Sequence, residues 1–302
     1  MAHLYEKENE YFRLVALEEP EAHISPILQR HLSINIKYEY DDKQQIIVTT
    51  HSTHIASYLE LQNTVVLYKD GSEIRNHYLL SGFDEKKPAD KKTVRYLQKW
   101  LNATNSTMFF SRKVIFVEGI AEEILIPIFY QWKYGESLDK INCQVVNVNG
   151  VAFSHFLEIV KNGYFIKSAV LTDSDCTKRT ETRAEELKEK YDSNITRIFV
   201  TEKSDTFEKE LFVTNKGKKA NRVYLADVLG KVRPNKCNDV FREKCYNAFD
   251  IDELFECVEK YKSEFAFELG EAMERTLKKS PRNKPFIIPK YILDAFKFIM
   301  GD

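Results

Sequence analysis

Residues 113–119 have the sequence KVIFVEG and decide the fold. The first five form an apolar, β-branched run of the length expected for a buried strand. Glu118 and Gly119 end this run, and residues 121–134 follow with the pattern of a helix that Gly135 terminates. A buried strand that passes directly into a helix is the first half of a βαβ unit.

The same pattern recurs downstream. It predicts further strands at 144–148, 168–172 and 197–201, with helices at 152–162 and 182–191 between them. Strands that alternate with helices of this length indicate a parallel sheet covered on both faces, and therefore an α/β fold. From about residue 206 onward the sequence is mostly helical in pattern, with basic loops expected at 215–222 and 278–284.

The first hundred residues have a different character. They predict strands at 12–17, 45–50 and 64–69, the last joined through Asp70 and Gly71 to a hairpin partner at 72–79. The charged, proline-containing residues 84–92 are expected to form a surface linker. An amphipathic helix is expected at 93–101.

Composition excludes several classes of protein. The chain has 302 residues, 43% hydrophobic and 30% charged, which is typical of a globular protein of about two domains. No apolar run approaches the roughly 18 residues of a membrane span, and no signal peptide begins the chain, so we expect a cytoplasmic protein with no membrane partner. The five cysteines have neither zinc-site nor disulfide spacing.

The balance of charge limits how the chain can bind nucleic acid. Its net charge is −1, from 45 basic and 46 acidic residues. Binding through overall positive charge is therefore excluded, whereas binding through a local basic patch is not.

Carboxylates follow two of the predicted strands. Glu118 ends the first, Glu122 lies one helical turn later, and Asp173 and Asp175 end the third. A single Glu there usually serves a helix N-terminus, and a lone Asp-x-Asp usually caps a turn. In an open parallel sheet, however, functional sites lie at the carboxyl ends of the strands, and both groups fall at that edge. Together they predict a functional site.

Several carboxylates in one cavity repel each other, and burying them without a partner costs several kcal/mol. A hard divalent cation offsets that cost. Carboxylate oxygens suit Mg²⁺ or Mn²⁺ better than zinc.

These motifs resemble those of a known domain. Val117-Glu118-Gly119 with Glu122, followed by Asp-Ser-Asp at 173–175, is similar to the Toprim domain of topoisomerases, primases and nucleases. The sequence therefore resembles a Toprim domain over roughly residues 110–210.

Three downstream elements narrow the resemblance to nucleases of the OLD (overcoming lysogenisation defect) family. Thr-Phe-Glu at 206–208 is similar to that family's Thr-Leu-Glu element, 262–266 to its Lys-Gly-x-Phe-Ala element, and 288–292 to its closing helix. Ser263 stands where the family often has Gly, which puts the local backbone in doubt.

The resemblance implies roles for particular residues. Lys262 would stabilise the transition state, and Glu118, Asp173 and Asp175 would be catalytic through two bound Mg²⁺ or Mn²⁺ ions. Without the resemblance, Lys262 would be interpreted as a solvated helix charge. The implied metal ligands, or their close neighbours, are Glu118, Glu122, Asp173, Asp175 and Glu208, with Glu210 as a second candidate in the same element.

Residues 1–82 resemble the carboxy-terminal lobe of an ABC-type ATPase. The strand that ends in Glu18 and Glu19 is similar to a Walker B element, although Glu18 replaces the usual Asp, and His51 matches the switch histidine. Alone, each feature has an ordinary alternative: a capped helix start, and a strand-end histidine.

No GxxxxGK[ST] loop occurs in the chain, so this sequence is not expected to hydrolyse ATP. We interpret it as the carboxy-terminal part of a longer, ATP-using protein. The expected organisation is a partial ATPase lobe at 1–82, a linker and helix at 83–109, and a Toprim nuclease domain with a helical insertion and tail at 110–302.

Three basic clusters are candidates for binding DNA, although each is more often a solvated surface. A cavity rich in carboxylates needs positive rims to hold a polyanion, so at least one cluster is expected to flank the metal site. The clusters comprise Lys86, Lys87, Lys91, Lys92 and Arg95; Lys216, Lys218, Lys219 and Arg222; and Lys278, Lys279, Arg282 and Lys284.

The sequence thus predicts a metal-dependent DNA endonuclease. The resemblance extends to nucleases of the Gabija anti-phage defence system, which implies a homo-oligomer and a helicase-like partner subunit. Two alternatives stay open: another Toprim enzyme, such as a primase or an RNA-processing nuclease, and a non-catalytic nucleotide-sensing DNA clamp with a structural Mg²⁺. Lys262 discriminates, because a structural metal site has no use for it.

Overall fold

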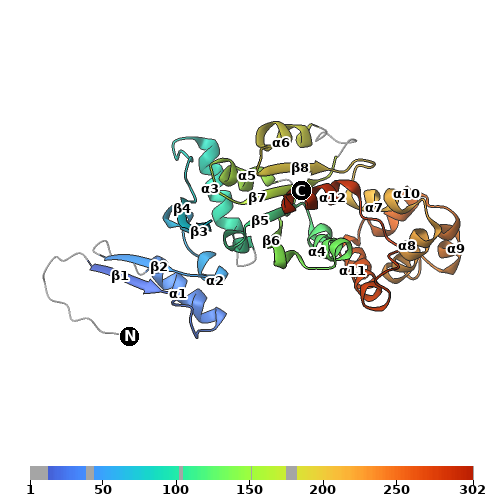
Figure 1. Ribbon diagram of the computed structural model, residues 1–302, viewed down its shortest axis with the longest axis horizontal. Coiled ribbons are helices and arrows are strands. Elements are labelled where there is room, and N and C mark those ends of the chain that lie inside the picture. Colours follow the sequence, from blue (N-terminus) through green and yellow to red (C-terminus); the bar gives the residue numbers. More distant parts are fainter. Residues whose placement is uncertain (1–12, 39–43, 102–104, 151, 175–181, 302) are drawn as a thin grey trace. The chain divides into compact units, whose positions relative to one another are not determined.

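The computed structural model describes residues 13–38, 44–101, 105–150, 152–174 and 182–301 (Figure 1). Contacts between residues divide the chain into two compact units, Met1–Phe110 and Ser111–Asp302.

The first unit contains a two-stranded parallel sheet. Strand β1 (Arg13–Glu18) pairs with β2 (Gln44–Thr49), and helix α1 (Pro26–Tyr38) connects them. Glu18 lies opposite Thr49, so the two strands end side by side. Both strands were predicted from their apolar runs, within one residue at each end.

A β-hairpin follows in the same unit. Strand β3 (Val65–Asp70) pairs antiparallel with β4 (Glu73–Tyr78), as predicted. Gly71 in the turn has φ +61°, a backbone conformation that glycine adopts without strain. The short helices α2 (Thr53–Ala56) and η1 (Leu61–Asn63) precede the hairpin.

The structure corrects the predicted linker at 84–92. Helix α3 spans Pro88–Trp100, so it begins five residues before the predicted helix. Pro88 occupies the first helical position, where a proline costs no hydrogen bond. The short helix η2 (Asn105–Phe110) then ends the first unit.

The second unit is built on a four-stranded sheet whose strand pairs are all parallel, as predicted. Its strand order is β6 (Cys143–Asn147), β5 (Lys113–Val117), β7 (Lys167–Thr172), β8 (Thr196–Val200). Most residues of β5 and β7 are buried.

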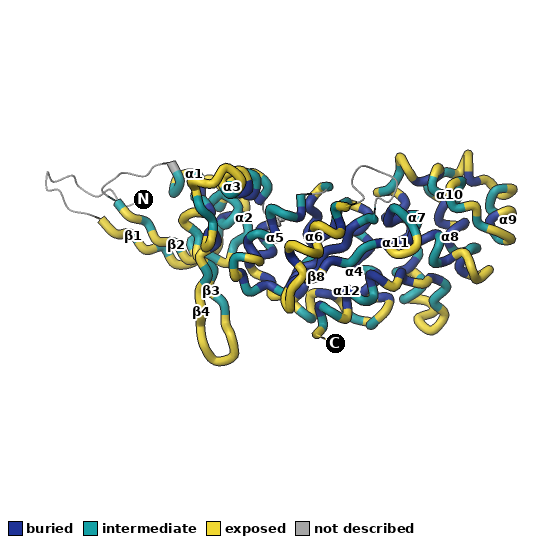
Figure 2. Tube along the Cα trace, turned by 90° about the horizontal axis from the view of Figure 1, so that it is seen from above, coloured by how far each residue is buried: buried dark blue, intermediate teal, exposed yellow. Residues whose placement is uncertain are grey.

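Helices cover both faces of this sheet. Ile115 and Leu171 belong to a core cluster with helices α4 (Ile120–Tyr134) and α12 (Lys290–Met300). On the other face, Phe116 contacts Phe156 of α5 (Phe153–Lys161), with ring centroids 5.6 Å apart. Helix α6 (Arg183–Tyr191) packs beside α5, and the Tyr191 hydroxyl donates to Glu158 at 2.7 Å. In Figure 2, buried segments in dark blue lie among the labelled elements α5, β8 and α4.

The remaining chain is helical, as predicted. Its helices are η3 (Leu138–Ile141), α7 (Phe207–Asn215), α8 (Lys219–Val232), α9 (Asp239–Asn247), α10 (Ile251–Val258) and α11 (Lys262–Lys279). Two predicted basic loops are corrected, because Lys219 and Arg222 lie in α8, and Lys278 and Lys279 form the last turn of α11. In the part of the chain that the structure describes, no helix is long and apolar enough to cross a bilayer.

Helix α11 packs closely on α4. A Cβ atom at Gly270 would lie 2.7 Å from Cδ1 of Ile128, so only glycine fits without movement at this crossing. This contact sets the position of the first residue of α11, Lys262, relative to the sheet.

Candidate active site

A cavity of about 250 Å³ opens at the carboxyl edge of the sheet. Strands β5 and β7 are neighbours, with Phe116 opposite Val170, so Glu118 and Asp173 emerge side by side. The ionisable residues that line the cavity are Glu118, Glu122, Asp173, Glu208 and Lys262. Four acidic residues and the lysine from the sequence analysis therefore meet in one place.

Three helices begin at this cavity. Glu122 lies in the first turn of α4, Glu208 in the first turn of α7, and Lys262 is the first residue of α11. The N-terminal end of a helix carries partial positive charge, which stabilises carboxylates there. Gly150, which also lines the cavity, has φ +107° and donates to the Glu118 carbonyl at 2.7 Å.

Glu118 is held by three donors on one oxygen. Its Oε1 accepts hydrogen bonds from the Thr172 hydroxyl, from the Asp173 backbone N–H at 3.0 Å and from the Arg183 guanidinium at 2.7 Å. Thr172 and Arg183 were not predicted. The one sequence signal for Arg183 is a cation at the start of the predicted helix that follows the Asp-Ser-Asp motif.

Two other carboxyls are strongly perturbed. Burial, and then repulsion by Glu208, raise the pKa of Glu122 to about 8. Burial, and then repulsion by Glu118 and Glu122, raise the pKa of Asp173 to about 9. Both carboxyls lie close to other negative charges, and a bound cation would offset this repulsion and favour their ionised forms.

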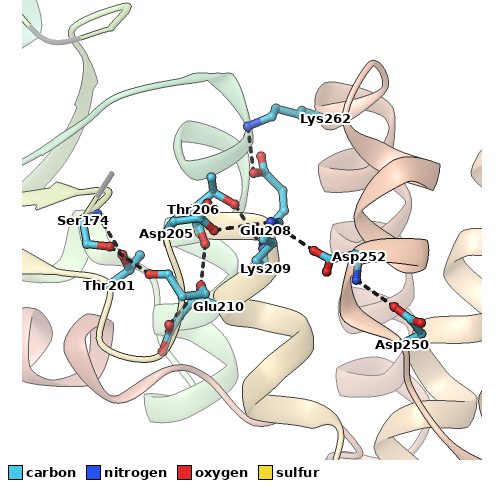
Figure 3. A network of polar contacts seen from close by, with 11 residues as sticks. Ser174, Thr201, Asp205, Thr206, Glu208, Lys209, Glu210, Asp250, Asp252 and Lys262 are labelled. Carbon is cyan, nitrogen blue, oxygen red and sulfur yellow. Dashed lines mark hydrogen bonds and ion pairs between the residues drawn. The ribbon is translucent and has the colours of Figure 1, made fainter. Parts of the chain in front are cut away.

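Glu208 and Lys262 form an ion pair across the cavity wall (Figure 3). The Lys262 ammonium lies 2.8 Å from Oε2 of Glu208, whose side chain is 2% exposed while that of Lys262 is 41% exposed. Burial lowers the pKa of Lys262, but the combined attraction of Glu208, Asp173 and Glu122 outweighs it, so the pKa lies above its usual value. The lysine is therefore charged and partly open to solvent.

Glu210 is placed differently from the other acidic residues. Its Oε2 accepts from the Lys203 backbone N–H at 2.8 Å and from the Ser204 hydroxyl at 3.2 Å, and it does not line the cavity (Figure 3). Ser174 in turn donates to the Ser204 carbonyl at 3.0 Å. Glu210 thus fixes the loop between β8 and α7.

The other residues predicted for a site are not among the described residues that line the cavity. Asp175 is outside the described residues. None of the described residues of the three basic clusters lines the cavity, so their place at its rim stays a prediction. In the first unit, His51 and Glu19 approach to 3.3 Å (Nε2 to Oε1), beyond the ends of β1 and β2. The His51 backbone N–H also donates to Glu21 at 2.8 Å.

The donors at the cavity fit a divalent cation in type. They are carboxylate oxygens, two with raised pKa values, around a space large enough for an ion and its water ligands. Among the described residues, no three His, Cys, Asp or Glu side chains already form a metal-binding group. Cation binding therefore requires small side-chain movements or a ligand outside the described ranges.

Comparison with known proteins assigns the core of this unit. Residues 109–175 match the family described as "Overcoming lysogenization defect protein-like, TOPRIM domain". The second unit contains an OLD-like Toprim domain. The match includes Glu118, Glu122 and Asp173, which all line the cavity of the Toprim domain.

Two curated relatives are similar over a longer stretch. The endonuclease GajA of Bacillus cereus (strain HuB5-5) is 24% identical over 221 residues, covering 65% of this chain and 30% of GajA. The Old nuclease of Escherichia phage P2 is 23% identical over 163 residues, covering 54% of this chain and 28% of that protein. The chain thus spans less than a third of the length of these two relatives.

Solved structures of OLD proteins are also similar to part of the chain. The C-terminal region of the Burkholderia pseudomallei OLD protein is 24% identical, with a TM-score of 0.46 over 64% of this chain and 98% of that one. The C-terminal region of the Xanthomonas campestris pv. campestris OLD protein is 23% identical, with a TM-score of 0.46 over 63% and 95%.

Proposed function

We propose that this chain is the nuclease part of an OLD-family protein and cleaves DNA phosphodiesters with Mg²⁺ or Mn²⁺. The observation that carries the proposal is a cavity at the carboxyl edge of the sheet, which collects four acidic residues and a charged lysine. The names of the two curated relatives, an endonuclease and a nuclease, support the same reaction class.

Glu118, Glu122, Asp173 and Glu208 would hold the metal, with Asp175 as a further ligand. Bound ions supply an activated water and stabilise the leaving oxygen. Glu210 is kept as a positioning residue, because both contacts of its carboxylate are to the loop before α7.

Lys262 has the role of stabilising negative charge on the scissile phosphate. It carries a full positive charge, lies at the cavity wall and is anchored by Glu208 at 2.8 Å. A preorganised cation is worth most in a site of low dielectric constant, where water screens it least.

The first unit would belong to the ATPase of the longer protein. The approach of His51 to Glu19, beyond the ends of adjacent parallel strands, supports this, because a switch histidine and a catalytic glutamate act on the same phosphate. Glu18 would organise the Mg²⁺ of ATP. Regulation of the nuclease by ATP, assembly into a homo-oligomer, a helicase-like partner and a role in Gabija-type anti-phage defence in the cytoplasm are parts of this proposal.

Plasmid cleavage tests the nuclease proposal. Supercoiled DNA is incubated with the chain and Mg²⁺ or Mn²⁺, beside the variants Glu118→Gln and Asp173→Asn. We expect nicked or linear product from the unaltered chain and at least about 100-fold less from either variant. Glu185→Gln, on the exposed surface of α6, is the matched control and should cleave normally.

Lys262→Met separates a nuclease from a DNA clamp with a structural cation. Under the nuclease proposal this variant binds Mn²⁺ but loses cleavage, since a neutral side chain cannot stabilise the transition state. Cleavage at the unaltered rate would remove Lys262 from the mechanism. If the unaltered chain and the longer protein both bind Mn²⁺ but cleave no DNA, the clamp is favoured.

A further inference from the structure

Arg183 forms a partly buried ion pair with Glu118, one of the residues that line the cavity. It is the first residue of α6, and its Nη2 lies 2.7 Å from Oε1 of Glu118 and 2.9 Å from the hydroxyl oxygen of Thr172. The side chains of Arg183 and Glu118 are only 14% and 16% exposed. The contact joins residues 65 positions apart in the sequence.

The donors around Glu118 define the orientation of its carboxylate. All three act on Oε1: the Thr172 hydroxyl, the Asp173 backbone N–H and the Arg183 guanidinium. Glu118 lines the cavity, whereas Thr172 and Arg183 do not. Two of the three donors therefore come from residues outside the cavity lining, and Oε2 of Glu118 accepts none of these three hydrogen bonds.

We propose that Arg183 is a positioning residue that holds Glu118 so that Oε2 binds the divalent cation. This inference rests on the proposed function, because it needs a cation at the carboxyl edge of the sheet. Carboxylates that bind metals commonly have hydrogen bonds on the oxygen that faces away from the ion. A charged donor restrains such a carboxylate more tightly than a neutral one does.

The energetics favour positioning over a purely structural role. A partly buried Arg–Glu pair is a weak source of stability, since desolvation and solvent screening offset most of the attraction. Arg183 does not line the cavity. A side chain that competes with the cation for its site would have to lie in the cavity, so the geometry argues against that role for Arg183.

Calorimetric titration with Mn²⁺ tests the proposal on the unaltered chain and three variants. We expect Arg183→Met to weaken Mn²⁺ binding about 10- to 100-fold, the usual effect of losing an outer hydrogen-bond partner of a metal ligand. Arg183→Lys keeps the charge but not the fork of donors, so its loss should be smaller. Thr172→Val removes a second donor to the same oxygen and should also weaken binding.

Arg75→Met is the matched control. Arg75 pairs with Asp70 at 3.1 Å and with Glu73 at 3.5 Å and does not line the cavity, so its loss should leave Mn²⁺ affinity unchanged. Circular dichroism at each pH and temperature used establishes that every variant is folded. If Arg183→Met does not fold, Arg183→Lys and Thr172→Val decide the question.

The outcomes separate this inference from the proposed function. Unchanged Mn²⁺ affinity in all three variants, or tighter binding in Arg183→Met, overturns the role of Arg183 and leaves the nuclease proposal standing. Mn²⁺ binding that weakens as expected, in a chain that never cleaves DNA, supports Arg183 and contradicts the nuclease. An unaltered chain that binds no Mn²⁺ overturns both.

Discussion

Glu122 and Asp173 are held in an environment that disfavours their charged forms. Their pKa values in the folded protein, about 8 and about 9, lie above the ordinary values of 4.5 and 3.8. A carboxyl with a raised pKa contributes stability that is complete below the unfolded value and is lost as pH rises through the folded value. The cation-free protein should therefore lose stability between about pH 5 and pH 9.

Thermal melts in the presence of a chelator measure this loss. We expect Tm to fall across that pH range in the unaltered chain and to fall less in Glu122→Gln, which has no proton to lose. Glu185→Gln, an exposed change on α6, should keep the full slope. A Tm equally flat in both proteins would show that Glu122 is ionised at neutral pH.

Gly119 leaves little room beside the carboxylate of Glu122. A Cβ atom there would lie 3.2 Å from Oε2 of Glu122, so Gly119→Ala should displace that carboxylate by a few tenths of an ångström. Because ligand placement matters at this scale, we expect several-fold weaker Mn²⁺ binding with little change in Tm. Gly217→Ala has open space around its Cβ and serves as the control; equal effects of the two changes would contradict the argument.

The sequence predicted the carboxylates at the carboxyl edge of the sheet, but not the side chains that hold them in place. Glu118 and Asp173 were identified because each follows an apolar strand, and strand order alone makes them neighbours. Arg183 could not be found in this way, since its contact depends on where α6 packs. Glu210 and Glu208 lie two positions apart on α7, and only the fold shows that Glu208 lines the cavity while Glu210 fixes a loop.

At the scale of elements, the crossing of α4 and α11 is the most sensitive to volume. Gly270→Leu would place a side chain against Ile128, where even a Cβ atom is 2.7 Å away. Such overpacking costs about 1–3 kcal/mol and should also move Lys262 at the start of α11. We expect a lower denaturation midpoint in urea together with reduced cleavage.

The smaller change Gly270→Ala is the graded control for this crossing. It adds one methyl group opposite the end of a flexible side chain, so a small loss of stability is expected. If Gly270→Leu were as stable as the unaltered chain, α11 and α4 would not be in close contact at this point.

Element boundaries were predicted best where apolar runs are short and bounded. Strand β5 was placed correctly at Lys113–Val117, and Gly135, in the left-handed conformation, ends α4. Helix α3 was predicted to start too late, because Pro88 and the lysines after it resemble a loop, although proline is favourable at a helix start. Lys219 and Lys279 were assigned to loops for the same reason, because runs of charged residues resemble surface loops even when they lie in helices.

For the whole molecule, the division at Phe110 and Ser111 predicts that the second unit folds by itself. Every residue of the largest core cluster belongs to this unit, which also supplies the whole lining of the cavity. A chain of residues 111–302 should therefore unfold in one cooperative transition and bind Mn²⁺ with the affinity of the full chain. Non-cooperative melting, or Mn²⁺ affinity reduced more than about tenfold, would contradict this prediction.

The ion pair between Glu208 and Lys262 has a consequence for the making of the protein. Lys262 is translated 54 residues after Glu208. At about 5–20 residues per second, Glu208 waits roughly 3–11 seconds for its positive partner. During that interval the nascent chain carries the acidic residues without this lysine, so the cavity is complete only once α11 has been made and has docked on α4.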